Sequence, residues 1–146
     1  MEVWAARIAQ KQGIQFGHEE TLTAGVVNLV RVMVVDDNAS FRMAAEQFVT
    51  EVCGASVIAQ ADSGEAAVEM ALRLRPQVIL MDLAMGGING IEAGRRIKAA
   101  DDSIKVVILT LNNGREYREL AESLALDGFV SKTDFTAVIC SVIESL

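Results

Sequence analysis

The sequence predicts an α/β fold built on a parallel β-sheet. From residue 30 onward, short runs of β-branched and other apolar residues alternate five times with longer amphipathic stretches. This alternation is typical of βαβ units, in which each helix returns the chain to the same edge of a parallel sheet. The length of 146 residues fits one domain, and the 51% of hydrophobic residues provides enough apolar surface for a core.

The first half of this region contains two strand and helix pairs. The first strand covers residues 30–35, and Asn38 or Ser40 is expected to cap the helix that follows. Gly54 is the expected stop of that helix. Its predicted buried face consists of Phe41, Ala44, Ala45, Phe48, Val49 and Val52. The second strand covers residues 55–59, and the second helix runs from Ser63-Gly64-Glu65 through Leu72 to a stop before Pro76.

The second half contains three more pairs. The third strand, residues 77–83, is an unbroken apolar run that ends in a single aspartate, Asp82, as expected for a strand buried on both faces. The remaining elements are a helix from Gly90 to about residue 100, a strand at 105–110, a helix at about 115–126, a strand at 128–131 and a final helix at 135–146.

Residues 1–29 do not fit the alternating pattern. Their apolar residues give at most a weak helical stripe, so we expect an N-terminal arm that is flexible. The alternative is a non-native start, in which translation begins at Met33 or near Val30. The folded domain is then residues 30–146, and no further domain is expected in this chain.

The composition excludes several classes of function. The chain has 20 acidic and 13 basic residues and a net charge of −7, which argues against direct nucleic acid binding. The apolar stretch at 24–35 is too short to span a membrane, and the first residues contain no apolar region of signal-peptide length, so a cytoplasmic protein is expected. Cys53 and Cys140 are too few for a disulfide scaffold and are expected to be buried apolar residues.

Polar residues gather where the predicted strands end. Asp36 and Asp37 follow the first strand, Asp82 ends the third, and Thr110 and Lys132 follow in the last two strands. In an open parallel sheet these carboxyl ends meet at one mouth, where ligands bind. Three neighbouring carboxylates repel one another unless a cation compensates them. Because carboxylates offer only oxygen ligands, which hard divalent cations prefer, the compensating cation is predicted to be Mg²⁺ (or Mn²⁺).

The same cluster is suited to phosphoryl chemistry. A carboxylate such as that of Asp82 can act as a nucleophile and form an acyl phosphate. Lys132 and the metal would then stabilise charge on the phosphoryl oxygens, and Thr110 adds a hydroxyl donor. The chain contains no G-x-x-x-x-G-K-[ST] loop, so nucleotide binding is not predicted.

Five motifs in order make the chain resemble the receiver domains of two-component response regulators, such as the chemotaxis regulators. The resemblance covers about residues 30–146. The matching segments are Val-Met-Val-Val-Asp36-Asp37, Ala61-Asp-Ser-Gly64-Glu-Ala-Ala, Val-Ile-Leu-Met-Asp82-Leu-Ala-Met85 with Gly90, Val-Ile-Leu-Thr110 and Asp127-Gly-Phe129-Val-Ser-Lys132. Lys132 is followed by Thr133, which is similar to the receivers of helix-turn-helix regulators.

The resemblance implies a flavodoxin-like, doubly wound sheet of five strands in the order 2-1-3-4-5, with five helices. It implies that Asp82 is the phosphoacceptor, supplied by a histidine kinase or a histidine phosphotransfer protein. The implied metal ligands are Asp37, Asp82, the backbone carbonyl of Ala84 and Asp36, directly or through water. Thr110 and Phe129 are the implied switch residues, and Lys132 pairs with the phosphoryl group.

Phosphorylation would change the face formed by the fourth helix, fifth strand and fifth helix, for partner binding or homodimerisation. We therefore expect a signalling switch rather than an enzyme, one that catalyses only its own phosphorylation and slow dephosphorylation. Two alternatives stay open. One is a receiver-like interaction module that works without phosphorylation. The other is a phosphatase with an aspartate nucleophile, which is disfavoured because Ala84 stands where such enzymes carry a second Asp.

Overall fold

A computed structural model of the chain describes residues 28–111 and 114–146. In these residues, five parallel strands form one sheet in the order β2-β1-β3-β4-β5, as predicted. The elements along the chain are β1 (Arg31–Val35), α3 (Ala39–Glu51), β2 (Ser56–Ala61), α4 (Gly64–Leu74), β3 (Val78–Asp82), α5 (Gly90–Ala100), β4 (Lys105–Thr110), α6 (Arg115–Ser123), β5 (Gly128–Ser131), the 3₁₀ helix η1 (Lys132–Asp134) and α7 (Phe135–Ser145).

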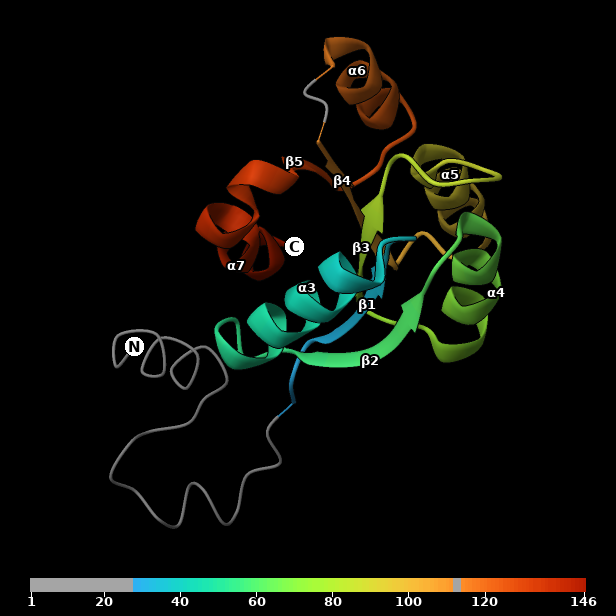
Figure 1. Cartoon of the computed structure of the whole chain (residues 1–146). Helices are drawn as coiled ribbons and strands as arrows, with labels where there is room; N and C mark the ends of the chain where they lie inside the picture. Colours follow the sequence, from blue (N-terminus) through green and yellow to red (C-terminus); the bar gives the residue numbers. More distant parts are fainter. Residues whose placement is uncertain (1–27, 112–113) are drawn as a thin grey trace, which may run out of the picture.

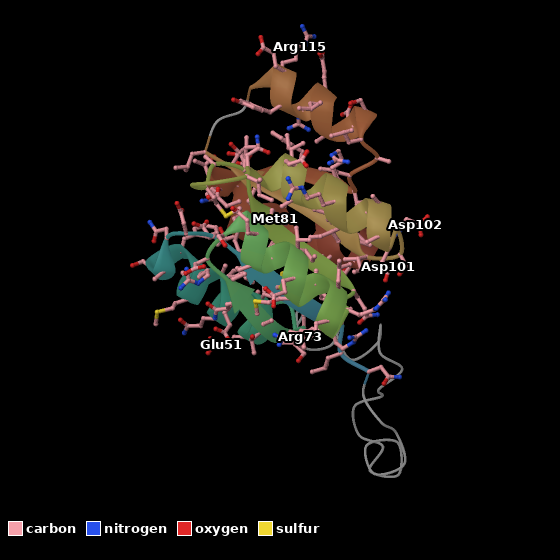
Figure 2. All side chains as sticks on the ribbon, turned by 90° about the vertical axis from the view of Figure 1, so that its right-hand side faces the viewer. Glu51, Arg73, Met81, Asp101, Asp102 and Arg115 are labelled. Carbon is pink, nitrogen blue, oxygen red and sulfur yellow. A yellow bond between two sulfur atoms is a disulfide. The ribbon has the colours of Figure 1, made fainter. Side chains whose placement is uncertain are left out.

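Helices cover both faces of the sheet (Figure 1). Helices α3 and α7 lie on one face, and α4 and α5 lie together on the other, where Figure 2 shows them side by side. Each strand contributes side chains to the hydrophobic cores on both faces of the sheet, because successive side chains point to opposite faces. In β3, for example, Ile79 and Met81 join the core under α4 and α5, whereas Val78 and Leu80 join the core under α3 and α7.

Short polar side chains set the beginnings of the helices. The Asn38 side chain accepts a hydrogen bond from the Phe41 amide at the start of α3, as the sequence predicts. Ser63 and Asn89 cap α4 and α5 in the same way. Gly54 follows α3 with a φ of 67°, a left-handed conformation that favours glycine. The caps therefore fix where the chain turns away from the sheet.

Several details differ from the sequence-based expectations; β2, for example, runs to Ala61 rather than ending at residue 59. Helix α6 ends at Ser123 rather than near residue 126, because Ala125 adopts a left-handed φ of 59° that stops the helix. The 3₁₀ turn η1 was not predicted. Ala44 is exposed rather than buried, because it lies toward the solvent edge of α3, whose buried residues are Ala45 and Val49.

The expectation for the cysteines was wrong. Cys53, just after α3, and Cys140, in α7, form a disulfide with a Cα–Cα distance of 5.1 Å. They are 87 residues apart in the sequence, and only the packing of α3 and α7 on the same face of the sheet brings them together. Cys140 is buried as expected, but as half of a covalent link.

The predicted N-terminal arm lies almost wholly outside the described residues, which begin at residue 28. Within the described ranges, no helix is both long and apolar enough to cross a membrane.

Candidate functional site

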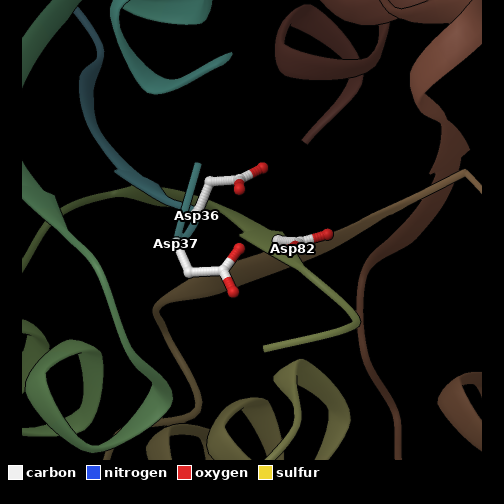
Figure 3. Close-up of side chains that lie close together, drawn as sticks. All are labelled: Asp36, Asp37 and Asp82. Carbon is white, nitrogen blue, oxygen red and sulfur yellow. The ribbon is translucent and has the colours of Figure 1, made fainter. Parts of the chain in front are cut away.

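Two neighbouring strands carry the three aspartates to one edge of the sheet. Asp36 and Asp37 directly follow β1, and Asp82 is the last residue of β3. Because β1 and β3 are paired with Val35 opposite Met81, the ends of the two strands are level. Figure 3 shows the three side chains close together at this edge. Their carboxylate oxygens lie within 4.8 Å of one another, as the sequence predicts.

The three carboxylates differ in exposure. Asp36 and Asp82 are buried, with 1% and 4% of their surface exposed, whereas Asp37 is exposed. A buried charge is costly unless hydrogen bonds or an opposite charge compensate it. The contacts of Asp36 and Asp82 therefore determine how the site is held together.

Asp36 is fixed from three directions. One carboxylate oxygen accepts a hydrogen bond from the Asn38 amide at 2.8 Å, and the other accepts one from Lys132 Nζ at 2.6 Å. The Asp36 backbone carbonyl accepts a hydrogen bond from the Arg42 guanidinium at 2.7 Å. Asp36 is thus a rigid anchor between β1, α3 and the segment after β5.

Lys132 bridges the two buried aspartates. Its Nζ atom lies 2.6 Å from Asp36 and 3.0 Å from Asp82, and only 11% of its side chain is exposed. The ammonium also lies 4.4 Å from the centre of the Phe41 ring, which favours a cation. Lys132 is the first residue of η1, so the end of β5 and this short turn together aim it into the site.

Burial and charge shift two pKa values at the site. The pKa of Asp82 is raised above its ordinary 3.8, first because burial disfavours the carboxylate; its hydrogen bond from Lys132 opposes the shift, and repulsion by Asp36 adds to it. Burial disfavours the Lys132 ammonium too, but its bonds to Asp36 and Asp82 outweigh burial and raise its pKa. Asp82 is therefore held next to a lysine that stays charged.

The site opens into a cavity of about 370 Å³. Thr110, the last residue of β4, lines it and is buried, in register with Ser131 of β5. Ala84, whose carbonyl is an expected metal ligand, lines it from the loop after β3. Phe129 is not among the lining residues. It lies on β5 with the Arg118 guanidinium of α6 located 5.0 Å from its ring centre.

A close backbone approach shapes the loop beside Asp82. The Gly90 amide donates a hydrogen bond to the Leu83 carbonyl at 2.9 Å. A Cβ atom at position 90 would lie only 2.1 Å from the Asp82 carbonyl oxygen. The start of α5 can therefore pack against the end of β3 only with glycine at this position.

Sequence reasoning missed several residues of the site. Asn38 was predicted as a helix cap through its side chain, but its backbone amide also donates a hydrogen bond to the Asp36 carboxylate. Arg42, which binds the Asp36 carbonyl, gave no signal in the sequence, and neither did Tyr117, which lines the cavity from α6. Phe41 was assigned to the core, and its contact with Lys132 depends on two elements 91 positions apart. These contacts depend on tertiary packing, which a local pattern does not carry.

The donor set fits a hard divalent cation. Asp36, Asp37 and Asp82 offer carboxylate oxygens at one opening, and these are the ligands that Mg²⁺ uses, together with water and phosphate oxygens. No histidine or cysteine is part of the cluster, so the softer ligands preferred by zinc are missing from it.

Comparison with known proteins agrees with this geometry. The family described as "Response regulator receiver domain" matches residues 32–144. The response regulator GacA of Pseudomonas viridiflava is 41% identical over 83 residues, covering 57% of this chain and 39% of that protein. The response regulator protein VraR of Staphylococcus saprophyticus is 32% identical over 117 residues, covering 79% of this chain and 55% of that protein. The chain thus spans about half or less of these relatives.

A solved structure gives the same result for the fold. The crystal structure of a two-component response regulator of the LuxR family from Aurantimonas has a TM-score of 0.77 and 28% sequence identity. The match covers 81% of this chain and 84% of that one. The five-stranded order, the aspartates at the ends of β1 and β3, and the family match over residues 32–144 together show that this chain belongs to the receiver domain family of two-component response regulators.

Proposed function

We propose that Asp82 accepts a phosphoryl group from a histidine kinase or a histidine phosphotransfer protein, with Mg²⁺ (or Mn²⁺) as the cofactor. The observation that carries this proposal is the position of Asp82 at the cavity, between two further carboxylates and the Lys132 ammonium. A carboxylate nucleophile, an oxygen donor set and a fixed positive charge are the groups that phosphoryl transfer to an aspartate requires.

The transfer itself needs few groups. A carboxylate oxygen of Asp82 attacks the phosphorus in line, the new O–P bond forms, and the N–P bond to the donor histidine breaks. Lys132 Nζ, now 3.0 Å from Asp82, is placed to pair with the incoming phosphoryl oxygens. Asp36 keeps Lys132 in position through the 2.6 Å contact while Asp82, the other partner of Lys132, becomes phosphorylated.

The residues that would hold the metal surround the acceptor. We assign Asp37 and Asp82 as side-chain ligands, Ala84 as a backbone carbonyl ligand, and Asp36 as a direct or water-mediated ligand. When bound, the metal supplies positive charge that neutralises the phosphoryl oxygens. Asp37 is the exposed member of the cluster, so it can take part in binding without breaking a buried contact.

The switch would operate through β4 and β5. Thr110 lies at the end of β4, and we propose that its hydroxyl turns toward the new phosphoryl group. Phe129 would then move inward and leave the guanidinium of Arg118, which now lies 5.0 Å from its ring. That loss would change the face formed by α6, β5 and α7, where we expect a partner or a second copy of this chain to bind.

Beryllofluoride tests the acceptor assignment. Wild-type protein with Mg²⁺ and beryllofluoride should show one modified site, and acetyl phosphate should add one phosphoryl group by intact mass. The Asp82→Asn protein should show neither, while Asp102→Asn, in the loop that precedes β4 at the opposite end of the sheet, should behave as wild type. Modification of Asp82→Asn at the wild-type level would refute the assignment.

Two further measurements, partner binding and phosphate release, separate the alternatives. A phosphorylation-independent interaction module would bind its partner equally well with and without beryllofluoride. A phosphatase would release phosphate from small substrates over many turnovers, whereas we expect one phosphoryl group per chain and only slow hydrolysis. A cytoplasmic location stays a prediction.

A further inference from the structure

We propose that Cys53 and Cys140 are a reversible thiol–disulfide pair, exchanged at the Cys53 sulfur with small disulfides such as oxidised glutathione, whose oxidised form clamps α7 onto the end of α3. The proposed exchange involves neither the aspartates nor the phosphorylation of Asp82.

The first support is where the disulfide lies. It joins the turn after α3 to the middle of α7, two elements that share one core and no other covalent link. The Cys53 amide donates a hydrogen bond to the Phe48 carbonyl at 3.3 Å, so the end of α3 holds this cysteine in place. Making or breaking the disulfide therefore changes how firmly α7 is held, while the sheet stays intact.

The second support is the packing between the disulfide and Lys132. The Phe135 ring, at the start of α7, lies 5.9 Å from the Phe48 ring and 5.6 Å from the Phe41 ring of α3. Phe41 in turn contacts Lys132. The α3–α7 seam, defined by these three rings, has the disulfide at one end and Lys132 at the other. Clamping one end restricts movement of α7 along the whole seam.

The third support is the unequal exposure of the two cysteines. Cys140 is buried, with 7% exposed, whereas Cys53 is partly exposed. An attacking thiolate reaches a sulfur by access from solvent. Exchange should therefore start at Cys53 and leave Cys140 as the departing thiol. One partly exposed and one buried cysteine thus leave the disulfide open to attack at one end.

Reduction of the disulfide takes two thiol–disulfide exchanges. The thiolate of reduced glutathione attacks Cys53 Sγ, forming a mixed disulfide and breaking the bond to Cys140, whose sulfur takes up a proton. A second glutathione thiolate attacks the mixed disulfide, releasing Cys53 as a thiol and oxidised glutathione. Two electrons pass from two glutathione molecules to the protein disulfide. Oxidised glutathione drives the reverse reaction. Because reduced glutathione reduces disulfides in this way, disulfides in cytoplasmic proteins are usually transient.

Wild-type protein in glutathione buffers of increasing oxidised fraction provides the first test. After acid quenching and alkylation, intact mass should show a single transition from two alkylated cysteines to none as the oxidised fraction rises. Protein that starts reduced and protein that starts oxidised should give the same curve. Cysteines that stay reduced in every buffer, or a disulfide that survives fully reduced glutathione in the folded protein, would overturn the proposal.

Two single variants test the site of exchange. Cys140→Ser leaves only Cys53, and Cys53→Ser leaves only Cys140. Because a buried thiol reacts only after local opening, alkylation should be at least about tenfold faster in Cys140→Ser. Equal rates would contradict exchange at Cys53.

Hydrogen exchange tests the clamp. The amides of α7 should exchange about tenfold faster in reduced than in oxidised wild-type protein, whereas those of α4 on the other face should change little. The Cys53→Ser/Cys140→Ser double variant should match the reduced protein in both buffers. Identical α7 exchange in the oxidised and reduced wild type would reject the clamp, and this comparison needs no variant to fold.

Discussion

Lys132 Nζ lies between Asp36 and Asp82, 2.6 Å from the first and 3.0 Å from the second, and links the ends of three strands. The link joins β1, β3 and the segment after β5. Asp36 is also fixed by the Asn38 backbone amide and by Arg42, so Lys132 has a rigid partner on one side and Asp82, the proposed acceptor, on the other. The same contact thus stabilises the fold and prepares Asp82 for charge.

Replacing Lys132 by Met should destabilise the metal-free protein by about 3–5 kcal/mol at pH 7, because it leaves two buried carboxylates without their cation. Methionine keeps an apolar stem against Phe41. Urea unfolding gives the change in free energy. Lys105→Met is the matched control, since Lys105 is 41% exposed and 3.9 Å from its nearest carboxylate, so it should cost no more than about 1 kcal/mol. Equal losses in both variants would contradict the bridging role.

The raised pKa of Asp82 predicts a pH dependence of stability. The folded protein binds a proton at Asp82 more tightly than the unfolded chain, whose pKa is near 3.8. This group's contribution to the free energy of unfolding therefore falls as pH rises from 3.8 through the raised folded pKa, and then levels off. Asn cannot titrate, so the free energy of unfolding of Asp82→Asn, measured in EDTA, should increase relative to that of the wild type as the pH rises through that window. A constant difference at every pH would show that the pKa of Asp82 is not raised.

Mg²⁺ should stabilise the folded protein by binding to the aspartates. At a concentration 100 times the dissociation constant, one site adds about 2.7 kcal/mol, which thermal unfolding detects. Asp37→Asn removes an exposed ligand without disturbing the buried contacts, so the variant should keep its metal-free stability and lose most of the Mg²⁺ effect. Asp102→Asn, an exposed carboxylate elsewhere, should respond as wild type does. An unchanged response in Asp37→Asn would remove Asp37 from the ligand set.

Gly90→Ala should lower stability by about 2–3 kcal/mol, because the new Cβ would collide with the Asp82 carbonyl oxygen. Gly86→Ala offers a matched control in the same loop. A Cβ there meets nothing within 4 Å, so its effect should stay within about 0.5 kcal/mol. Relief of the clash must also move the end of β3, so Gly90→Ala should react more slowly with acetyl phosphate. Similar stability of both variants would contradict the close packing.

The sheet order was implied only by the resemblance to receiver domains, whereas the five strands and the aspartate cluster were predicted from the residues themselves. Apolar strands end in polar residues, and the carboxyl ends of parallel strands meet at one edge. Arg42 and the role of Phe41 beside Lys132 could not be predicted, since each requires knowing how α3 sits on the sheet. The end of α6 was missed because Ala125 adopts a left-handed conformation that alanine does not signal.

The disulfide is the clearest case of a feature that only the fold reveals, and it carries a prediction for stability. A link between residues 87 positions apart restricts the unfolded chain, so reduction should lower the free energy of unfolding by about 2–4 kcal/mol. Urea unfolding of the wild type with and without reductant measures this difference. The Cys53→Ser/Cys140→Ser variant should be insensitive to reductant and close to the reduced wild type. An unchanged wild-type midpoint, in protein that alkylation shows to be reduced, would contradict this stabilisation.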